Sequence, residues 1–204
     1  MDARIEVALL LILFTLPAVV KIGTYRVSYG KMPIGISERS SGTERFLAGS
    51  LIALVGGHYA FGALYLWEPD LVDVAHPFES LASGAVQTLG LVVGLISLGL
   101  TAWAQATMGE AWKIGIDRDG VAELVKHGPF RWIRNPIYTG MMGTSVGLFL
   151  LVPCDPSLVL VVLTVYGLQL QARLEEDFLR DEHGDAYGAW VAITGRFLPR
   201  LGSG

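Results

Sequence analysis

Apolar residues lie along the chain in five long stretches, separated by shorter polar segments. The stretches run from Val7 to Ile22, from Phe46 to Trp67, from about Ala85 to Ala106, from Ile137 to Val152 and from Ser157 to Leu170. A helix needs roughly 17–25 apolar residues to cross the hydrocarbon core of a bilayer. The pattern therefore predicts five transmembrane helices, of which the last two are short for a full crossing.

The end of the chain adds two further elements to this pattern. Only Pro153 to Pro156 separate the last two stretches, so we expect those helices to form a tight antiparallel hairpin. Apolar residues then repeat at near-helical spacing, which predicts a C-terminal helix at the membrane interface or packed on the bundle: Leu174, Phe178, Leu179, Tyr187, Trp190 and Val191. Because no repeat or linker divides the sequence, we expect an all-α membrane protein with a single domain, residues 1–204.

Composition supports a membrane protein and excludes several other classes. Of the 204 residues, 52% are hydrophobic and only 17% are charged, whereas soluble domains carry about 25% charged residues. This balance excludes a disordered chain, and a net charge of −4 disfavours a nucleic-acid partner. The single cysteine excludes a disulfide framework. The four histidines are far apart in the sequence, so we expect no metal site.

The charges between the stretches predict how the chain crosses the membrane. Lys and Arg follow the first, third and fifth stretches, whereas the segments 68–84 and 153–156 contain none. Because basic loops stay in the cytoplasm, the N-terminus is expected outside, and the third connection and the tail inside. The residues before Val7 are not net positive and no small-residue cleavage site follows Val20. The first stretch is therefore interpreted as a retained helix rather than a signal peptide.

Two polar segments on the predicted cytoplasmic side are candidates for chemistry. The first runs from Lys126 to Tyr138 and contains two prolines, of which Pro136 suits the first position of a helix. The second contains Glu175 and Glu176, which point about 100° apart on a helix and so cannot serve one identical partner. Taken alone, the first segment is typical of a helix start with arginines at the membrane surface. The second is typical of a solvated helix paired with Arg180.

Taken together, the two segments resemble the isoprenylcysteine carboxyl methyltransferase and phospholipid methyltransferase superfamily of membrane enzymes. Its pattern appears here as Gly128-Pro129-Phe130, Arg134-Asn135-Pro136-Ile137-Tyr138, Glu175-Glu176, Gly184-Asp185-Ala186-Tyr187 and Pro199. The resemblance covers about residues 108–200. Asn135 stands where the family has a histidine, so the role of that imidazole must be absent or moved, for example to His127.

The resemblance implies methyl transfer from S-adenosyl-L-methionine, held in a cytoplasmic cofactor pocket. Its residues would be His127, Gly128, Pro129, Phe130, Arg134, Asn135, Pro136, Tyr138, Glu175 and Glu176. Arg134 suits the cofactor carboxylate, and Glu175 or Glu176 its ammonium or ribose hydroxyls. Tyr138 or Phe130 suits the sulfonium, and His127 with the Gly128 backbone suits the adenine.

The acceptor is expected to be a lipophilic molecule or lipid that enters from the bilayer. A carboxylate acceptor needs a positioning cation such as Arg196 or Arg173, whereas an amine needs a base such as Glu176. The resemblance favours O-methylation of an isoprenylcysteine-like, fatty or isoprenoid acid. N-methylation of a lipid amine such as phosphatidylethanolamine is the alternative, and a non-catalytic scaffold or carrier is a third. Of the two glutamates, Glu176 is favoured because Ala172, one turn earlier, leaves room for a ligand.

A few other residues carry weaker expectations. His58 is interpreted as a packed, hydrogen-bonded histidine within a span, although ionisable groups there are often functional. The pairs Gly90/Gly94 and Gly143/Gly147 predict closely packed helices. Trp67, Trp112, Trp132 and Trp190 are interpreted as interfacial anchors, with Trp112 near enough to line the site.

Overall fold

The computed structural model describes residues 3–30, 32–35, 40–70, 77–116 and 124–200. Five α-helices account for most of them: α1 (Ala3–Tyr29), α2 (Gly42–Trp67), α4 (Gly84–Met108), α5 (Pro136–Leu151) and α6 (Asp155–Ile193). Three short 3-10 helices connect them: η1 (Glu79–Leu81), η2 (Gly109–Ala111) and η3 (Gly128–Arg131). The described residues form isolated bridges but no strands. The predicted all-α architecture with five apolar helices is confirmed.

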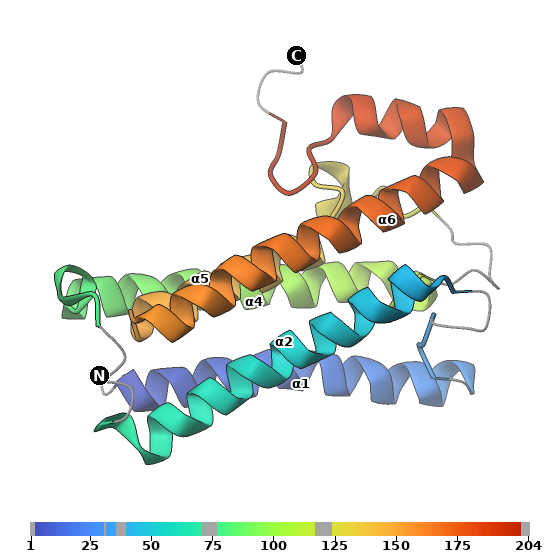
Figure 1. Cartoon of the computed structure of the whole chain (residues 1–204). Coiled ribbons are helices and arrows are strands. Elements are labelled where there is room, and N and C mark those ends of the chain that lie inside the picture. Colours follow the sequence, from blue (N-terminus) through green and yellow to red (C-terminus); the bar gives the residue numbers. More distant parts are fainter. Residues whose placement is uncertain (1–2, 31, 36–39, 71–76, 117–123, 201–204) are drawn as a thin grey trace.

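The helices run alternately in opposite directions, with α1 and α2 beside the group formed by α4, α5 and α6 (Figure 1). The start of α1, the described residues between α2 and α4 and the α5–α6 hairpin lie at one end, which we call the hairpin end. The described residues that follow α1 and α4 lie at the other end, together with η3 and the described residues after α6. We call this the motif end, because both polar segments of the sequence reach it.

Helix lengths agree with a chain that spans a bilayer. Four helices, α1, α2, α4 and α6, are long and apolar enough to cross a membrane. The fifth, α5, has 16 residues, which corresponds to a length of about 24 Å. The sequence predicted this short helix, and its N-terminus is set by Pro136 at the first helical position.

Glycines allow α4 and α5 to pack closely. A Cβ on Gly147 would lie 2.8 Å from the carbonyl oxygen of Gly90 and 2.9 Å from the Cα of Gly94. A Cβ on Gly143 would lie 2.2 Å from the Oγ of Ser97. Because the neighbours of Gly147 are backbone atoms, no larger residue fits there without separating the helices. The predicted packing of the two glycine pairs is therefore confirmed.

The last helix differs from its prediction. The expected fifth span and C-terminal helix form one element, α6, because the sequence between Leu170 and His183 contains no helix breaker. At Gly184 the backbone adopts φ 49° and ψ −124°, which kinks the helix. The residues after Gly184 then turn back over the motif end (Figure 1). Tyr187 and Trp190 from this last part are buried against Ala104 and Phe130.

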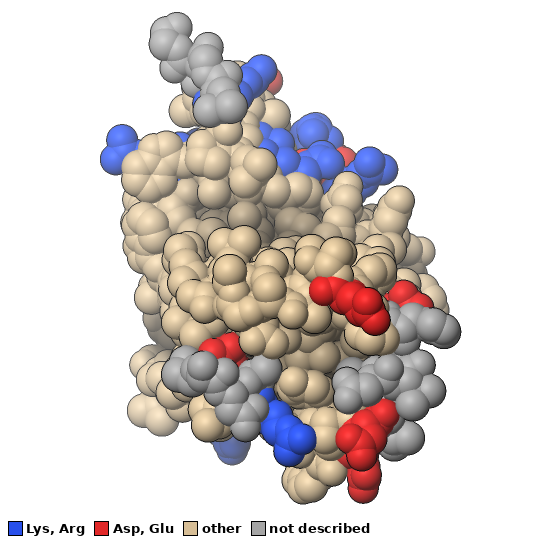
Figure 2. Space-filling model, turned by 90° about the vertical axis from the view of Figure 1, so that its left-hand side faces the viewer, with Lys and Arg blue, Asp and Glu red and all other residues tan. Residues whose placement is uncertain are grey.

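Charges distinguish the two ends of the bundle. At the hairpin end, the described connections carry the acids Glu68, Asp70, Glu79 and Asp155 and no lysine or arginine. Figure 2 views the molecule from this end; its surface is mostly uncharged, with scattered acidic side chains and some basic ones near the lower margin. The largest group of Lys and Arg lies along the upper margin, where the C-terminal part of the chain lies in Figure 1.

Candidate active site

A cavity of about 460 Å³ opens between the helices and reaches the motif end. This volume lies within the roughly 300–1,000 Å³ that is usual for small-molecule sites. One part is apolar and is lined from α1 and α2 by Phe14, Ala18, Ile22, Leu51, Ile52 and Val55. Another part is polar and is lined from α4, the segment before α5, α5 and α6 by Gln105, Arg134, Asn135, Tyr138, Gln171 and Glu175. The cavity thus offers polar groups and an apolar surface to the same occupant.

The Gly128-Pro129-Phe130 motif forms η3, which packs against α4. Gly128 has a φ of +58°, and a Cβ there would lie 2.8 Å from the Oγ1 of Thr107. Both the backbone and the close approach therefore require glycine. Pro129 and Phe130 are buried, and the Phe130 carbonyl accepts a hydrogen bond of 3.1 Å from the Trp190 indole. The motif thus holds the last part of α6 against the bundle.

Glu176 lies at the centre of a buried ion-pair cluster. Its carboxylate accepts hydrogen bonds from Nη2 of Arg196 at 2.7 Å, from Nε of Arg134 at 3.2 Å and from the amide of Asn135 at 3.1 Å. The side chain of Glu176 is 5% exposed and that of Arg134 10%. The hydrogen bond to Glu176 raises the pKa of Arg196 further above its ordinary value, so this cation persists at any ordinary assay pH.

The backbone after α6 pairs with the segment before α5. The amides of Arg134 and Asn135 donate to the carbonyls of Gly195 and Arg196 at 2.8 and 3.0 Å. The Gly195 amide donates to the Trp132 carbonyl at 3.1 Å. Nη1 of Arg134 also donates to the Thr194 carbonyl at 2.6 Å. The Glu176 cluster and these bonds together hold the C-terminal segment at the motif end.

Glu175 has different surroundings from its neighbour. It lines the cavity, and its Oε1 accepts hydrogen bonds from the Tyr138 hydroxyl and, at 2.8 Å, from the Gln171 amide. Tyr138 lies on the first turn of α5, so two helices position this carboxylate. Glu175 is therefore the acid that faces the cavity, whereas the sequence favoured Glu176 for that place.

The structure divides the predicted site residues into three groups. The first group lines the cavity: Phe130, Arg134, Asn135, Pro136, Tyr138 and Glu175. The second group lies beside the cavity: Gly128 and Pro129 belong to η3, and the exposed His127 comes directly before it. Glu176 and Arg196 form the ion-pair cluster beside the cavity rather than its lining, and Arg173 is exposed on α6.

Sequence reasoning missed Gln105 and Gln171 as parts of this site. Gln105 lies on α4, is 8% exposed and lines the cavity. Its buried Oε1 has no hydrogen-bond partner among the described residues. A glutamine within a long apolar helix is the signal that could have found it, because polar groups there are costly.

The tryptophans only partly match their predicted role as anchors. Trp67 and Trp132 are exposed, by 78% and 44%. Trp112 is 6% exposed and lines the cavity, and Trp190 is 5% exposed and packs on Tyr187. Trp112 and Trp190 are therefore part of the protein interior, and their interpretation as interfacial anchors is wrong, but Trp112 does line the site as expected.

Comparison with solved structures identifies a related fold. The structure of the eukaryotic intramembrane Ras methyltransferase ICMT (isoprenylcysteine carboxyl methyltransferase) matches with a TM-score of 0.52 and 18% sequence identity. The match covers 80% of this chain and 55% of the other, so this chain spans little more than half of that protein's length. No curated protein sequence matches the chain.

Comparison with protein families identifies the family itself. The profile of the phospholipid methyltransferase family matches residues 85–186, which are 102 of the 204 residues. The matched range begins with α4 and includes η3, α5 and both glutamates of α6. It therefore contains most of the polar cavity lining described above. The chain belongs to the phospholipid methyltransferase family.

Proposed function

We propose that this protein transfers a methyl group from S-adenosyl-L-methionine to the head group of a lipophilic acceptor. The observation that carries the proposal is the cavity, whose polar part combines residues of the family motif with Gln105 and Gln171 and whose apolar part is lined from α1 and α2. A polar cofactor and a membrane-derived acceptor need this combination of surfaces. A scaffold would need neither, and a carrier would place its polar groups near mid-span at helix breaks.

The polar lining fits the chemical groups of the cofactor. Nε and Nη1 of Arg134 are engaged by Glu176 and Thr194, so Nη2 is the nitrogen we assign to the cofactor carboxylate. Glu175 is left for the acceptor amine rather than for the cofactor ammonium. The Oε1 of Gln105, which has no hydrogen-bond partner among the described residues, can accept an N–H or O–H from the bound molecule. The cofactor supplies a methyl group on a positively charged sulfur.

The residues of the chain then act mainly by placement. In the reaction a bond forms from the acceptor nitrogen or oxygen to the methyl carbon while the carbon–sulfur bond breaks. Holding the two partners in line supplies much of the rate enhancement in such transfers. Tyr138 and Gln171 hold the Glu175 carboxylate, and Tyr138 lines the cavity, where its ring would suit the sulfonium.

The position of Glu175 in the cavity favours an amine acceptor over the carboxylate that the sequence favoured. Glu175 attracts an ammonium and can take its proton before transfer. The cations proposed to position a carboxylate do not line the cavity, because Arg196 is bound to Glu176 and Arg173 is exposed. A carboxylate acceptor is the second candidate, because Lys113 does line the cavity.

A methyl-transfer assay with the purified protein in lipid nanodiscs tests the proposal. The acceptors are phosphatidylethanolamine, a fatty acid and a prenylcysteine, each with labelled S-adenosyl-L-methionine. We expect phosphatidylethanolamine to be methylated. Glu175→Gln should slow this reaction, and high pH should restore part of the rate because the amine then loses its proton unaided.

The matched control is Asp177→Asn, which removes an exposed acid two residues along the same helix. It should leave the rate and its pH dependence unchanged. A loss in Glu175→Gln that high pH does not rescue, with methylation of the fatty acid or prenylcysteine, would favour the carboxylate candidate. Absence of S-adenosyl-L-methionine binding to the folded protein would overturn the proposal and favour a scaffold.

A further inference from the structure

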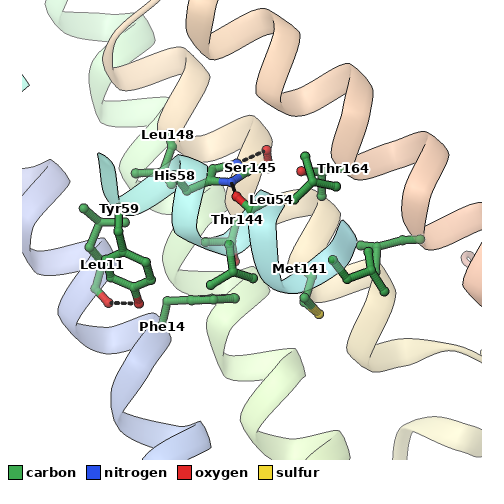
Figure 3. A pocket seen from close by; sticks show the side chains of 13 residues that line it. Leu11, Phe14, Leu54, His58, Tyr59, Met141, Thr144, Ser145, Leu148 and Thr164 are labelled. Carbon is green, nitrogen blue, oxygen red and sulfur yellow. Dashed lines mark hydrogen bonds between the residues drawn. The ribbon is translucent and has the colours of Figure 1, made fainter. Parts of the chain in front are cut away.

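A second, smaller cavity of about 40 Å³ lies within the bundle and carries an unusual polar group of residues (Figure 3). His58 from α2, Ser145 from α5 and Thr164 from α6 all line it, and the remaining lining is mostly apolar. Polar residues within membrane spans are rare and often functional. The sequence had pointed only to His58, and the structure adds two hydroxyl groups from separate helices.

The hydrogen bonds of this group show which donors and acceptors are already used. Nδ1 of His58 lies 2.9 Å from the Leu54 carbonyl. A carbonyl only accepts, so Nδ1 carries the hydrogen, and Nε2 of the neutral imidazole is an acceptor. The Ser145 hydroxyl, 2.8 Å away, therefore donates to Nε2. This leaves the lone pairs of the Ser145 oxygen as acceptors.

Thr164 supplies the complementary donor. Its residue is 7% exposed, and its buried Oγ1 has no hydrogen-bond partner among the described residues. Leaving a buried hydroxyl unpaired is costly, and valine would fill the same space without that cost. By contrast, the Thr144 hydroxyl on the same cavity already donates to the Gly140 carbonyl, and Tyr59 donates to the Leu11 carbonyl.

The small cavity adjoins the large one. Five residues line both cavities: Phe14, Leu51, Val55, Met141 and Leu168. Along α6, Thr164 precedes Glu175 by eleven residues, which is a distance of about 16 Å. A long apolar chain whose head lies at Glu175 therefore has a route past Met141 towards Thr164.

We propose that the small cavity is a subsite for a hydroxyl group on the tail of the lipophilic acceptor, an inference that rests on the proposed function. An alcohol both donates and accepts, so its hydrogen can go to the Ser145 oxygen while its oxygen accepts from Thr164. A purely hydrocarbon tail satisfies neither group. A bound water has the same hydrogen-bonding chemistry and is the alternative source that the experiment must distinguish.

The experiment compares matched lipids that differ only in one hydroxyl. Phosphatidylethanolamine and the free fatty acid are each prepared with a stearoyl chain and with a stearoyl chain hydroxylated at a middle carbon. Binding to the purified protein is measured from the rise in its thermal unfolding midpoint, and methyl transfer is measured separately. The variants are Thr164→Val and Ser145→Ala, with Thr144→Val as the matched control.

We expect the hydroxylated chains to bind about threefold to tenfold more tightly than the plain chains, as one hydrogen bond allows. Thr164→Val and Ser145→Ala should each remove this preference, and Thr144→Val should keep it. Thr164→Val should also unfold at the same or a higher temperature without lipid, because it removes a buried hydroxyl that has no partner among the described residues.

Equal binding of plain and hydroxylated chains, with methyl transfer intact, would overturn the tail subsite and leave a water as the occupant. Loss of the preference in Thr144→Val as well would overturn the assignment to Thr164. If neither kind of chain binds or is methylated, the proposed function itself fails, and the subsite fails with it.

Discussion

At the scale of single residues, two neighbouring glutamates have different surroundings because successive helix positions point about 100° apart. Glu175 faces the cavity with Tyr138 and Gln171, and Glu176 faces the arginines that hold the C-terminal segment. We therefore expect changes at Glu175 to act mainly on catalysis and changes at Glu176 to act mainly on stability.

Glu176→Gln should lower the free energy of unfolding by roughly 3 kcal/mol, the cost of removing one partner from a buried ion pair. The cause is that Arg134 would keep a buried charge with no acid opposite it. Thermal and chemical unfolding in detergent measure the effect. Asp177→Asn breaks an exposed pair with Arg180 and should change stability by less than about 1 kcal/mol. Equal stability of the two variants would contradict the structural role of Glu176.

Gln105→Leu should weaken binding of S-adenosylhomocysteine by about 0.5–1.5 kcal/mol, the net value of one hydrogen bond. The unliganded protein should remain as stable or gain stability, because the buried Oε1 has no partner among the described residues. Titration calorimetry gives the affinity. Gln87→Leu, on the same helix but near the hairpin end, is the control and should leave the affinity unchanged. Unchanged affinity in Gln105→Leu would remove this residue from the binding site.

At the scale of elements, the kink in α6 decides how the site is closed. The positive φ at Gly184 lets the last part of the helix turn back, and the Trp190 indole then reaches the Phe130 carbonyl of η3. Tyr187 is fully buried in the same contact. The conformation of Gly184 thus brings the segment that follows it into contact with the Gly128-Pro129-Phe130 motif, which lies more than fifty residues earlier in the sequence.

Gly184→Ala should destabilise this contact by about 1–3 kcal/mol, because an L-residue with a side chain is strained at this φ and ψ. Two measurements test this: limited proteolysis, which should cut the chain faster beyond Gly184, and thermal unfolding, whose midpoint should fall. Gly188→Ala is the matched control: Gly188 is helical, and a Cβ there meets nothing within 4 Å. It should be neutral or slightly stabilising. Wild-type behaviour of Gly184→Ala would contradict the requirement for glycine at the kink.

At the scale of the whole molecule, the bundle has two chemically different ends. Basic connections and the polar cavity share the motif end, and the described connections at the hairpin end carry only acids. Because basic loops stay in the cytoplasm, we propose that the motif end is cytoplasmic. A cytoplasmic site would also have access to a soluble cofactor.

An impermeant thiol reagent on intact cells should therefore label Glu79→Cys at the hairpin end and leave Arg180→Cys at the motif end unlabelled until the cells are opened. Both positions are exposed. The natural Cys154 is 2% exposed and should contribute little background. Labelling of Arg180→Cys alone in intact cells would reverse the proposed orientation.

Sequence alone determined the features that depend on neighbouring residues. The five apolar stretches predicted the helices, the glycine pairs predicted the contact of α4 with α5, and the two polar segments predicted which end holds the motif. Hydrophobic periodicity is a local property, so it can be read before the chain is folded. The sequence pattern did not show that α6 is one continuous helix. A polar continuation of the fifth span and a separate C-terminal helix give similar patterns of apolar residues.

Tertiary structure alone decided how the helices are rotated and which side chains meet. It placed Glu175 rather than Glu176 in the cavity, bound Arg134 and Arg196 to one carboxylate, left Arg173 exposed, and joined His58 with Ser145. These pairings depend on the packing of helices that are distant in the sequence, and a rotation by one residue turns each side chain by about 100°. The sequence determined which groups were present at the motif end, and only packing determined which of them face the cavity.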